Sequence, residues 1–461
     1  MPGGPDRAAR WSGGRARLGR IFFGYADPMS LARWCALAAG LAAQLACAPR
    51  EGRRARPAQP VDVLVVGCGI AGLSAAVEAA SAGARVLVVD RWSVFGGHAV
   101  MSGGGVTMID TPLQRAAGVV DGPRRAAADF LAWGGDADPG WVRRYAERSR
   151  VEVHDWLTAM GVVFERVSQL AGNSVPRYHR TRDRGLGLVI PIYRNAVALG
   201  VELAWNQDVV ELIVEAGQVR GVRSRDLRTG AGRVWRAGAV VLATGGFQSD
   251  LIRVRQNWPA GLPLPPRVLA GSGVNSTGDG LDLARRAGAA VHRLDHQWNY
   301  PTGLPDPRAR GGERGLNVEV PQSIWVNAAG ERFVDEQAGV RVTFPAVLRQ
   351  PGGSFWAVLD ADGAAAIAVS GPEWSDRALV ERLILSDPSL VTRAGDLRTL
   401  ATGAGLPPAA LERAVAAHNR SGAGFAIARP PYHAMRLYPL ARKSMGGVAV
   451  DVAGRVLDRR G

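Results

Sequence analysis

The chain has 461 residues, of which 47% are hydrophobic, and a formal net charge of +15 at pH 7. This length and composition suffice for a large core and predict two domains. Three cysteines, Cys35, Cys47 and Cys68, exclude a disulfide framework and a cysteine-rich metal site. We predict no nucleic-acid partner, because no basic stripe with interleaved aromatic residues accompanies the charge. Lys443 is the only lysine among 56 basic residues, which is typical of a GC-rich genome.

Residues 1–60 read as a leader followed by a linker. Ten arginines face only three acidic residues there, Asp6, Asp27 and Glu51. The apolar run from Trp34 to Ala48 fits the core of a signal peptide and is too short for a transmembrane span. Two alternatives remain open: an exported protein, periplasmic or lipid-anchored through Cys47, and a cytoplasmic protein with an N-terminal extension.

Residues 61–105 carry the strongest motif of the chain. The β-branched run Val61–Val66 predicts a buried parallel strand, and Gly67, Gly69 and Gly72 follow it in GxGxxG spacing. A small-residue helix is expected from Ala71 to Ala82, then a second strand from Arg85 to Val89 that ends at Asp90. This order predicts a dinucleotide site, with the pyrophosphate at the helix N-terminus and Asp90 on the ribose.

A second glycine-rich segment favours FAD over NAD. Gly96-Gly97-His98-Ala99 and Ser102-Gly103-Gly104-Gly105 come soon after Asp90. A nicotinamide domain has no evident use for them, whereas a flavin needs close backbone approach along its length.

The next 140 residues alternate helices, one polar loop and strands. Arg177–Arg184 is expected to be a basic, solvated loop, and Cys68 a small packed residue. Expected helices cover Arg124–Trp133, Trp141–Met160 and Leu186–Leu199, and expected strands cover Val201–Ala204, Asp208–Glu215, Val219–Arg225, Val234–Arg236 and Ala239–Leu242.

Two further turns precede the predicted second domain. Ala243-Thr244-Gly245-Gly246 ends a buried strand, and Ser276-Thr277-Gly278-Asp279-Gly280 leads into a helix, Leu281–Ala287, that Thr277 or Asp279 can cap.

Together these motifs resemble the FAD-dependent oxidoreductase 2 family. That family includes the flavoprotein subunits of fumarate reductase and succinate dehydrogenase, soluble flavocytochrome-type fumarate reductases and 3-ketosteroid dehydrogenases. The resemblance spans about residues 61–461. Its markers are VVGCGIAGLSAA, GGHAVMSGGGV, VVLATGGF, NSTGDG, VNAAGERFVDE, PPYHA and SMGGVAVD, in this order.

The resemblance implies an α/β fold: a Rossmann-like FAD-binding domain, whose parallel sheet carries a β-meander, and an inserted α+β capping domain. It implies an FAD-binding domain over 61–290, a capping domain over 291–428 and a return to the first domain over 429–461. The implied FAD-binding residues are Gly67, Gly69, Ala71, Gly72, Asp90, Arg91, Gly97, His98, Ala99, Gly103, Gly104, Val209, Ala243, Thr244, Gly245 and Asp279.

The implied activity is hydride transfer between flavin N5 and a carbon–carbon bond next to a carbonyl or carboxylate, on a small-molecule substrate. Fumarate reductases carry two substrate histidines where this chain has Tyr300 and Lys443, which argues against fumarate or succinate. Arg341 is the candidate for the family's proton-donating arginine, and a cation such as Arg341 or Lys443 is expected to stabilise a developing enolate or carboxylate. Tyr300 and Tyr432 fit carbonyl chemistry of the ketosteroid type, and Arg332 is expected to pair with Glu336.

His98 aligns with the histidine that bonds covalently to FAD in succinate dehydrogenase, and a hydrogen bond to the cofactor is the alternative. A last pair of strands is expected at Val448–Val450 and Arg455–Leu457. The family continues past GRVLDRRG with a further flavin-binding segment, so the FAD domain is expected to be incomplete here. A non-catalytic FAD-fold protein that needs a partner segment therefore remains the alternative function. No haem or iron–sulfur motif occurs, so a separate electron donor or acceptor is expected.

Overall fold

The computed structural model describes residues 60–422 and 424–460. The signal-like apolar run and Cys47 lie outside the described residues. Among the described residues, none of the helices combines the length and the apolarity that a bilayer crossing needs.

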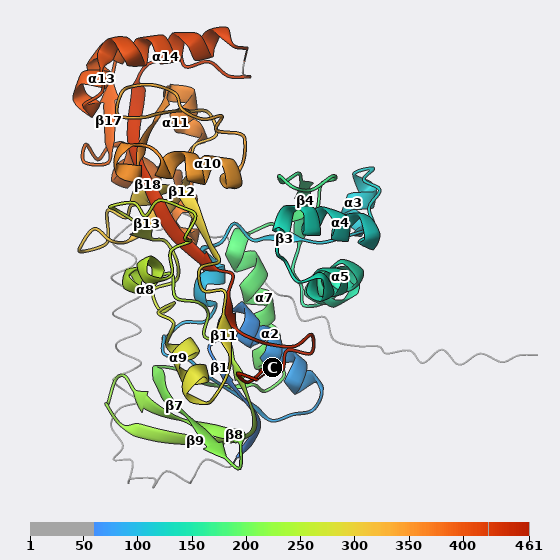
Figure 1. The fold of residues 1–461 in the computed structure, drawn as a ribbon. Helices are drawn as coiled ribbons and strands as arrows, with labels where there is room; N and C mark the ends of the chain where they lie inside the picture. Colours follow the sequence, from blue (N-terminus) through green and yellow to red (C-terminus); the bar gives the residue numbers. More distant parts are fainter. Residues whose placement is uncertain (1–59, 423, 461) are drawn as a thin grey trace, which may run out of the picture. The chain divides into compact units, whose positions relative to one another are not determined.

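The first sheet carries the glycine-rich turn and has the strand order β6-β2-β1-β9-β8-β7. β1 lies parallel to β2 and β9, while β7 and β8 fold antiparallel onto β9 as a meander (Figure 1). This confirms the predicted α/β class, but the two short strands expected at 234–236 and 239–242 form one strand. The bounds are β1 Val61–Val66, β2 Val86–Val89, β6 Glu202–Ala204, β7 Gln207–Glu215, β8 Gln218–Asp226 and β9 Gly232–Leu242.

Two helices pack on this sheet, α2 (Ile70–Ser81) and α7 (Arg184–Ala198). Their apolar faces and the strand interiors share one core, in which Val65, Leu73 and Ile192 are fully buried. The GxGxxG turn is therefore held between the β-branched strand β1 and the small-residue helix α2.

The second sheet has eight strands and is organised by one long strand, β18 (Tyr432–Ser444). The first half of β18 pairs with β15 and β17, and its second half pairs with β10 and β12. The domain division predicted at residue 429 remains a prediction, since one strand serves both parts. The other bounds are β10 Leu269–Ala270, β12 Gln297–Pro305, β13 Gly315–Glu319, β14 Ile324–Val326, β15 Phe355–Leu359, β16 Ala368–Val369, β17 Val391–Ala394, α10 Val340–Leu348, α11 Ala361–Ala366, α12 Arg377–Val380, α13 Leu397–Ala404 and α14 Pro408–Arg420.

A smaller lobe, residues 105–181, contains the sheet β3-β5-β4 and several helices. The prediction of a basic, solvated loop at Arg177–Arg184 is wrong. Tyr178–Thr181 forms the strand β5, and Arg177 and His179 are fully buried, because carboxylates of the neighbouring segments pair with Arg177. The bounds are β3 Gly105–Thr107, α3 Pro112–Ala116, α4 Pro123–Gly134, α5 Pro139–Arg148, α6 Trp156–Ala159 and β4 Phe164–Ser168, with a π-helical stretch from Ser149 to Asp155 where one helix was expected.

The C-terminal strands also differ from expectation. Strands were predicted at 448–450 and 455–457, but a single bridge, Val450 to Val456, joins them. Instead β19 (Gly447–Val448) pairs with β11 (Val291–His292). The remaining helices are α8 (Leu251–Gln256), α9 (Asp279–Arg286) and the 3-10 helix η1 (Gly97–Met101).

Candidate active site

The three glycines of the first turn have different structural roles. Gly67 has φ +108°, and a Cβ there would lie 2.4 Å from the carbonyl oxygen of Ala243. A Cβ on Gly72 would lie 1.9 Å from the carbonyl oxygen of Gly67, whereas a Cβ on Gly69 would meet nothing within 4 Å. Gly67 and Gly72 therefore allow close backbone packing, and Gly69 leaves open space beside the turn.

That space lies at the N-terminus of α2. Gly69 is the N-cap residue, and no side chain caps the helix. The N–H groups of the first turn have no helical acceptor, and together with the helix dipole they favour an anion. This turn fits the pyrophosphate of a dinucleotide cofactor.

Asp90 ties the turn to the end of β2. One carboxylate oxygen accepts from the Cys68 N–H at 2.6 Å and the other from the Trp92 N–H at 2.7 Å. Burial raises the pKa of Asp90. Cys68 is 1% exposed, and burial, with the nearby charge of Asp90, raises the pKa of its thiol to about 12, which confirms it as a packed residue. The ribose contact predicted for Asp90 remains a prediction.

The turns after β1, β2 and β9 meet the start of α9. Arg91 pairs with Asp208 at 2.9 Å and with Asp279 at 2.6 Å, beside Val209 on β7. A Cβ on Gly280 would strike the Thr244 hydroxyl. Neither Thr277 nor Asp279 caps α9, because Gly278 occupies the N-cap and Asp279 turns to Arg91. The structure thus brings predicted residues of these five segments together at the carboxyl ends of β1, β2 and β9.

His98 lies on η1, in the second glycine-rich segment. Its Nδ1 accepts the backbone N–H of Gly273 at 3.0 Å. Burial, together with the charges of Arg442, Lys443 and Arg314, lowers the pKa of His98 to about 3. The ring is therefore neutral at pH 7, and because Nδ1 is an acceptor, the tautomer with the proton on Nε2 follows.

Three cations surround His98 on the side of β12 and β18. The guanidinium of Arg442 is 5% exposed and donates to the carbonyl oxygens of Gly271 and Met101, while its Nε has no acceptor among the described residues. Burial, and the nearby charge of Arg314, lower the pKa of Arg442. Arg314 in turn donates to the carbonyl oxygen of Ser272 at 2.7 Å.

Tyr300 completes this group, which we call the cation cluster: His98, Tyr300, Arg314, Arg442 and Lys443. Its ring centroid lies 6.0 Å from Cζ of Arg442 and 5.6 Å from Nζ of Lys443. Tyr300 and Lys443 were predicted as catalytic and lie together. Arg314 and Arg442 were missed as site residues, although an arginine at a buried strand position of β18 is an unusual signal.

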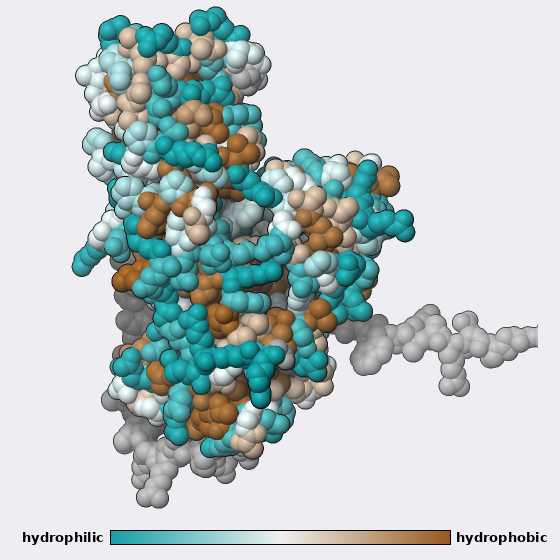
Figure 2. All heavy atoms as spheres, in the orientation of Figure 1, coloured by the Kyte–Doolittle hydropathy of each residue, from teal (hydrophilic) through white to brown (hydrophobic). Residues whose placement is uncertain are grey.

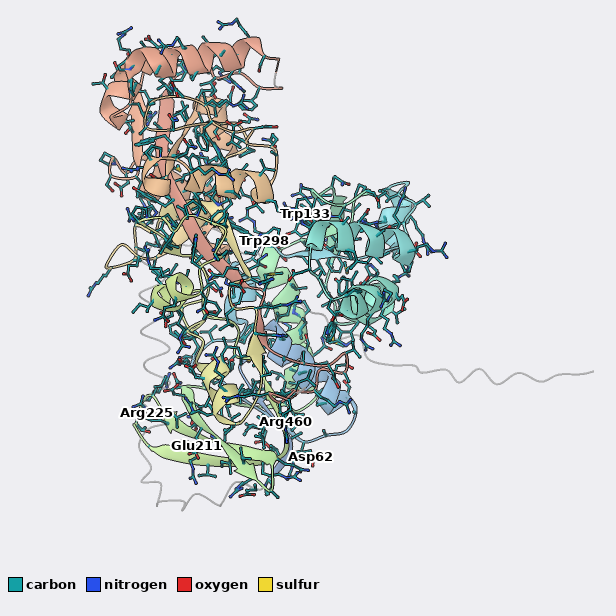
Figure 3. The ribbon with its side chains drawn as sticks, in the orientation of Figure 1. Asp62, Trp133, Glu211, Arg225, Trp298 and Arg460 are labelled. Atoms are coloured by element: carbon teal, nitrogen blue, oxygen red, sulfur yellow. The ribbon has the colours of Figure 1, made fainter. Side chains whose placement is uncertain are left out.

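The other two predicted catalytic residues lie elsewhere. Arg341, at the start of α10, donates to the carbonyl oxygen of Trp133, and its Cζ lies 4.9 Å from the centroid of that ring. Trp133 is at the end of α4 (Figure 3). Tyr432 is eleven residues from Lys443 along β18, a span of about 35 Å, and donates to the carbonyl oxygen of Ala428. Arg332 pairs with Glu336 at 2.5 Å, as predicted.

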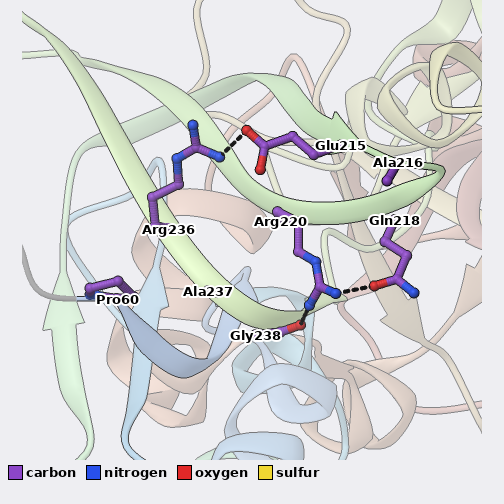
Figure 4. A pocket seen from close by; sticks show the side chains of 8 residues that line it. All are labelled: Pro60, Glu215, Ala216, Gln218, Arg220, Arg236, Ala237 and Gly238. Atoms are coloured by element: carbon purple, nitrogen blue, oxygen red, sulfur yellow. Dashed lines mark hydrogen bonds and ion pairs between the residues drawn. The ribbon is translucent and has the colours of Figure 1, made fainter.

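A surface groove at the meander is a separate feature (Figure 4). It lies near Pro60, at the opposite end of β1 from Gly67, and its charged side chains satisfy one another: Arg236 pairs with Glu215, and Arg220 donates to Gln218 and to the carbonyl oxygen of Gly238. Apolar residues gather over the meander in Figure 2, where Val210, Val214 and Val234 are exposed. Among the described residues, no group of three or more histidine, cysteine or acidic side chains could hold a metal ion.

Comparisons with known proteins give consistent matches. Residues 62–461 match the model of the family described as "FAD binding domain". The chain is 30% identical over 425 residues to a fumarate reductase (cytochrome) of Shewanella frigidimarina, covering 88% of this chain and 70% of the relative. It is 33% identical over 306 residues to a KsdD-like steroid dehydrogenase of Mycobacterium tuberculosis, covering 59% of this chain and about half, 54%, of that protein. Among solved structures, an open flavocytochrome c3 fumarate reductase shares the fold with a TM-score of 0.71 at 24% identity, over 96% of this chain and 75% of that one.

Proposed function

The chain belongs to the FAD-binding-domain family, with fumarate reductase and steroid dehydrogenase relatives, and on that premise we propose which reaction it catalyses. It is an FAD-dependent oxidoreductase, and FAD is its cofactor. The proposed reaction is hydride transfer between the flavin and a carbon–carbon bond next to a carbonyl or carboxylate, with a proton transferred at the neighbouring carbon. The proposal includes a separate electron donor or acceptor.

The observation that carries this proposal is the cation cluster beside η1. Burial lowers the pKa of both Arg442 and Arg314; Tyr300 opposes this shift for Arg442, and the charge of Asp306 opposes it for Arg314. Within residues 60–422 and 424–460, neither guanidinium forms a salt bridge with a carboxylate. Buried cations of this kind are costly unless an anion or a developing negative charge compensates them. A substrate carboxylate, or the enolate that forms from a ketone, supplies that charge.

The residues proposed to hold FAD are those of the converging segments and of the η1 segment beside them. The α2 N-terminus would take the pyrophosphate, Asp90 and Arg91 the adenosine half, and the η1 segment the flavin half. When bound, the flavin supplies hydride chemistry. The chain would provide the substrate site: the Tyr300 hydroxyl donates to a carbonyl oxygen, and the fixed charge of Arg442 stabilises negative charge on that oxygen.

Tyr300→Phe tests this site against Tyr438→Phe, a matched change on β18 that leaves the cation cluster intact. Both variants and the wild type are loaded with FAD and assayed with fumarate plus reduced methyl viologen, and with 4-androstene-3,17-dione plus an electron-accepting dye. We expect Tyr300→Phe to lower kcat about 100-fold or more, since one general acid contributes at least this much, and to keep FAD bound. Equal rates in the two variants, or no turnover by the wild type with any unsaturated acid or ketone, would contradict the proposal.

Arg341 is the competing proton-transfer candidate, and it excludes a residue of the cation cluster from that role. Its contact with Trp133 places it between α10 and α4, and the family motif before it carries the assignment. Arg341→Ala tests this alternative: loss of turnover with FAD still bound would support Arg341 as the proton donor, and near-full activity would remove Arg341 from the site.

A further inference from the structure

Lysine is used once in this chain, although arginine is used everywhere else. All other members of the 56 basic residues are arginine. Arginine even serves at exposed helical positions where lysine works equally well, such as Arg148 paired with Glu152 and Arg377 paired with Glu381. Residue 443 is therefore the one position of the chain at which a basic side chain ends in an amine and not in a guanidinium.

The place of this lysine is the cation cluster. Lys443 lies on β18 opposite Trp298 of β12, and its Nζ is 5.6 Å from the ring centroid of Tyr300. Its charge contributes to lowering the pKa of His98, so Nζ acts on the η1 segment as well. Of the 461 positions, the one lysine occupies a place beside both the predicted carbonyl donor and the predicted flavin loop.

Lys443 also differs from its neighbour Arg442. The guanidinium of Arg442 is buried and fixed by the carbonyl oxygens of Gly271 and Met101. The Lys443 side chain is exposed, and within residues 60–422 and 424–460 no carboxylate or carbonyl oxygen accepts from its Nζ. Arg442 therefore provides a fixed charge, whereas Nζ can move toward a bound molecule.

The chemistry that separates the two side chains is proton exchange. A guanidinium stays protonated and forms a planar fork that suits a carboxylate, while an amine releases and takes up a proton and offers a compact charge. A carboxylate clamp at residue 443 would favour arginine, which this chain supplies at every other position. Proton transfer favours lysine.

We propose that Lys443 transfers the substrate proton, an inference that rests on the proposed function. In dehydrogenation, the C–H bond next to the carbonyl breaks and its proton goes to the Lys443 amine. The electron pair of that bond forms the C=C bond as the adjacent carbon loses its hydride to the oxidised flavin, so the substrate loses two electrons and two hydrogens. In reduction, the ammonium returns the proton to the same carbon. Tyr300 and Arg442 hold the carbonyl oxygen meanwhile.

The main test compares Lys443→Arg with Arg436→Lys, a reciprocal exchange on the same strand at a side chain that stacks on Trp356. Flavin content and kcat are measured for both FAD-loaded proteins. We expect Lys443→Arg to keep its flavin and to lose about 100- to 10,000-fold in kcat, the contribution of a positioned proton-transfer group, while Arg436→Lys stays near wild type. If Lys443→Arg keeps kcat within threefold of wild type, or if it loses its flavin, the inference is overturned.

Chemical rescue separates the amine from the positive charge. Lys443→Cys is treated with 2-bromoethylamine, which rebuilds a side chain ending in an amine, and the treated wild type is the control for Cys68 and the other cysteines. At least tenfold recovery of kcat supports proton transfer by the amine. No recovery, with alkylation of residue 443 verified by mass spectrometry, overturns it.

A last readout does not depend on turnover. Acetic anhydride acetylates the FAD-loaded wild type, and the peptide with Lys443, the only lysine, is followed by mass spectrometry with and without fumarate or cyclohex-2-enone. Protection by either probe supports a place for Lys443 in the substrate site, and no protection by both overturns it. If the wild type turns over no substrate, the proposed function fails, and this protection result still decides whether Lys443 faces a ligand.

Discussion

Two buried arginines of this protein have opposite surroundings. Arg177, in the small lobe, is fully buried and forms ion pairs with Asp121 at 2.8 Å and with Asp129. Arg442, in the cation cluster, is buried to nearly the same degree but donates only to carbonyl oxygens and has further cations around it.

The presence or absence of carboxylate partners separates an arginine that stabilises the fold from an arginine whose charge acts in a binding site. A buried arginine with two carboxylates is neutralised by its own chain, so its loss leaves carboxylates without a partner. A buried arginine without a carboxylate keeps a net positive field in its surroundings, which is useful only where a bound anion or a developing negative charge meets it. We therefore expect Arg177 to govern stability and Arg442 to govern chemistry.

The largest effect is expected from Arg177→Met. Removing the guanidinium leaves the buried carboxylate of Asp121 and the partly buried carboxylate of Asp129 without their cation, which costs about 3–5 kcal/mol of unfolding free energy. Urea unfolding measures this loss, and the exposed Arg182→Met is the control that should leave the unfolding midpoint near that of wild type. A loss no greater than that of the control would mean that the small lobe is not held by this network.

A smaller loss of stability is expected from Arg442→Met, below about 2 kcal/mol, because two hydrogen bonds to carbonyl oxygens are lost but a desolvated charge and its repulsion by Arg314 disappear with them. Turnover should nevertheless fall at least 100-fold. The same urea series measures the first quantity and an assay of the FAD-loaded protein the second. A loss of stability as large as that of Arg177→Met, with turnover retained, would reverse the comparison.

The same variant should change the titration of His98. With the charge of Arg442 gone, the pKa of His98 should rise above about 3, although burial still holds it below the ordinary value near 6.5. NMR of the His98 ring as a function of pH measures the shift. An unchanged pKa would show that Arg442 exerts no field at the η1 segment.

The smallest effect is expected at an exposed charge contact of the small lobe. The carboxylates of Asp295 and Asp136 raise the pKa of His296, and Arg293 also faces Asp136, at 3.6 Å. Since the folded pKa is raised, the stabilisation is fully present below the unfolded pKa of about 6.5 and is lost as the pH rises through the folded pKa. The Tm difference between wild type and Asp136→Asn should therefore be largest at acidic pH and shrink toward neutral and alkaline pH; a difference that grows with pH would be the wrong sign.

Local patterns were sufficient for the glycine turn and its strands. The run Val61–Val66, the spacing of Gly67, Gly69 and Gly72, and the position of Asp90 all concern residues close in the chain, and the structure forms the elements they predict. The prediction of a loop at Arg177–Arg184 was wrong because the arginines there were assumed to be solvated. Only the tertiary fold supplies Asp121 and Asp129, some 50 residues earlier, to bury Arg177.

The sequence by itself determined the α/β class, the dinucleotide turn, the FAD assignment through its family motifs and the single lysine, because these are properties of short segments and of composition. The tertiary structure decided which side chains share a site. It joined Tyr300, Arg314, Arg442 and Lys443 to His98 and left Tyr432 at the far end of β18. Which side chains share the site depends on the strand register and on where the long strand β18 pairs with its partners. The periodicity of a segment determines neither of these.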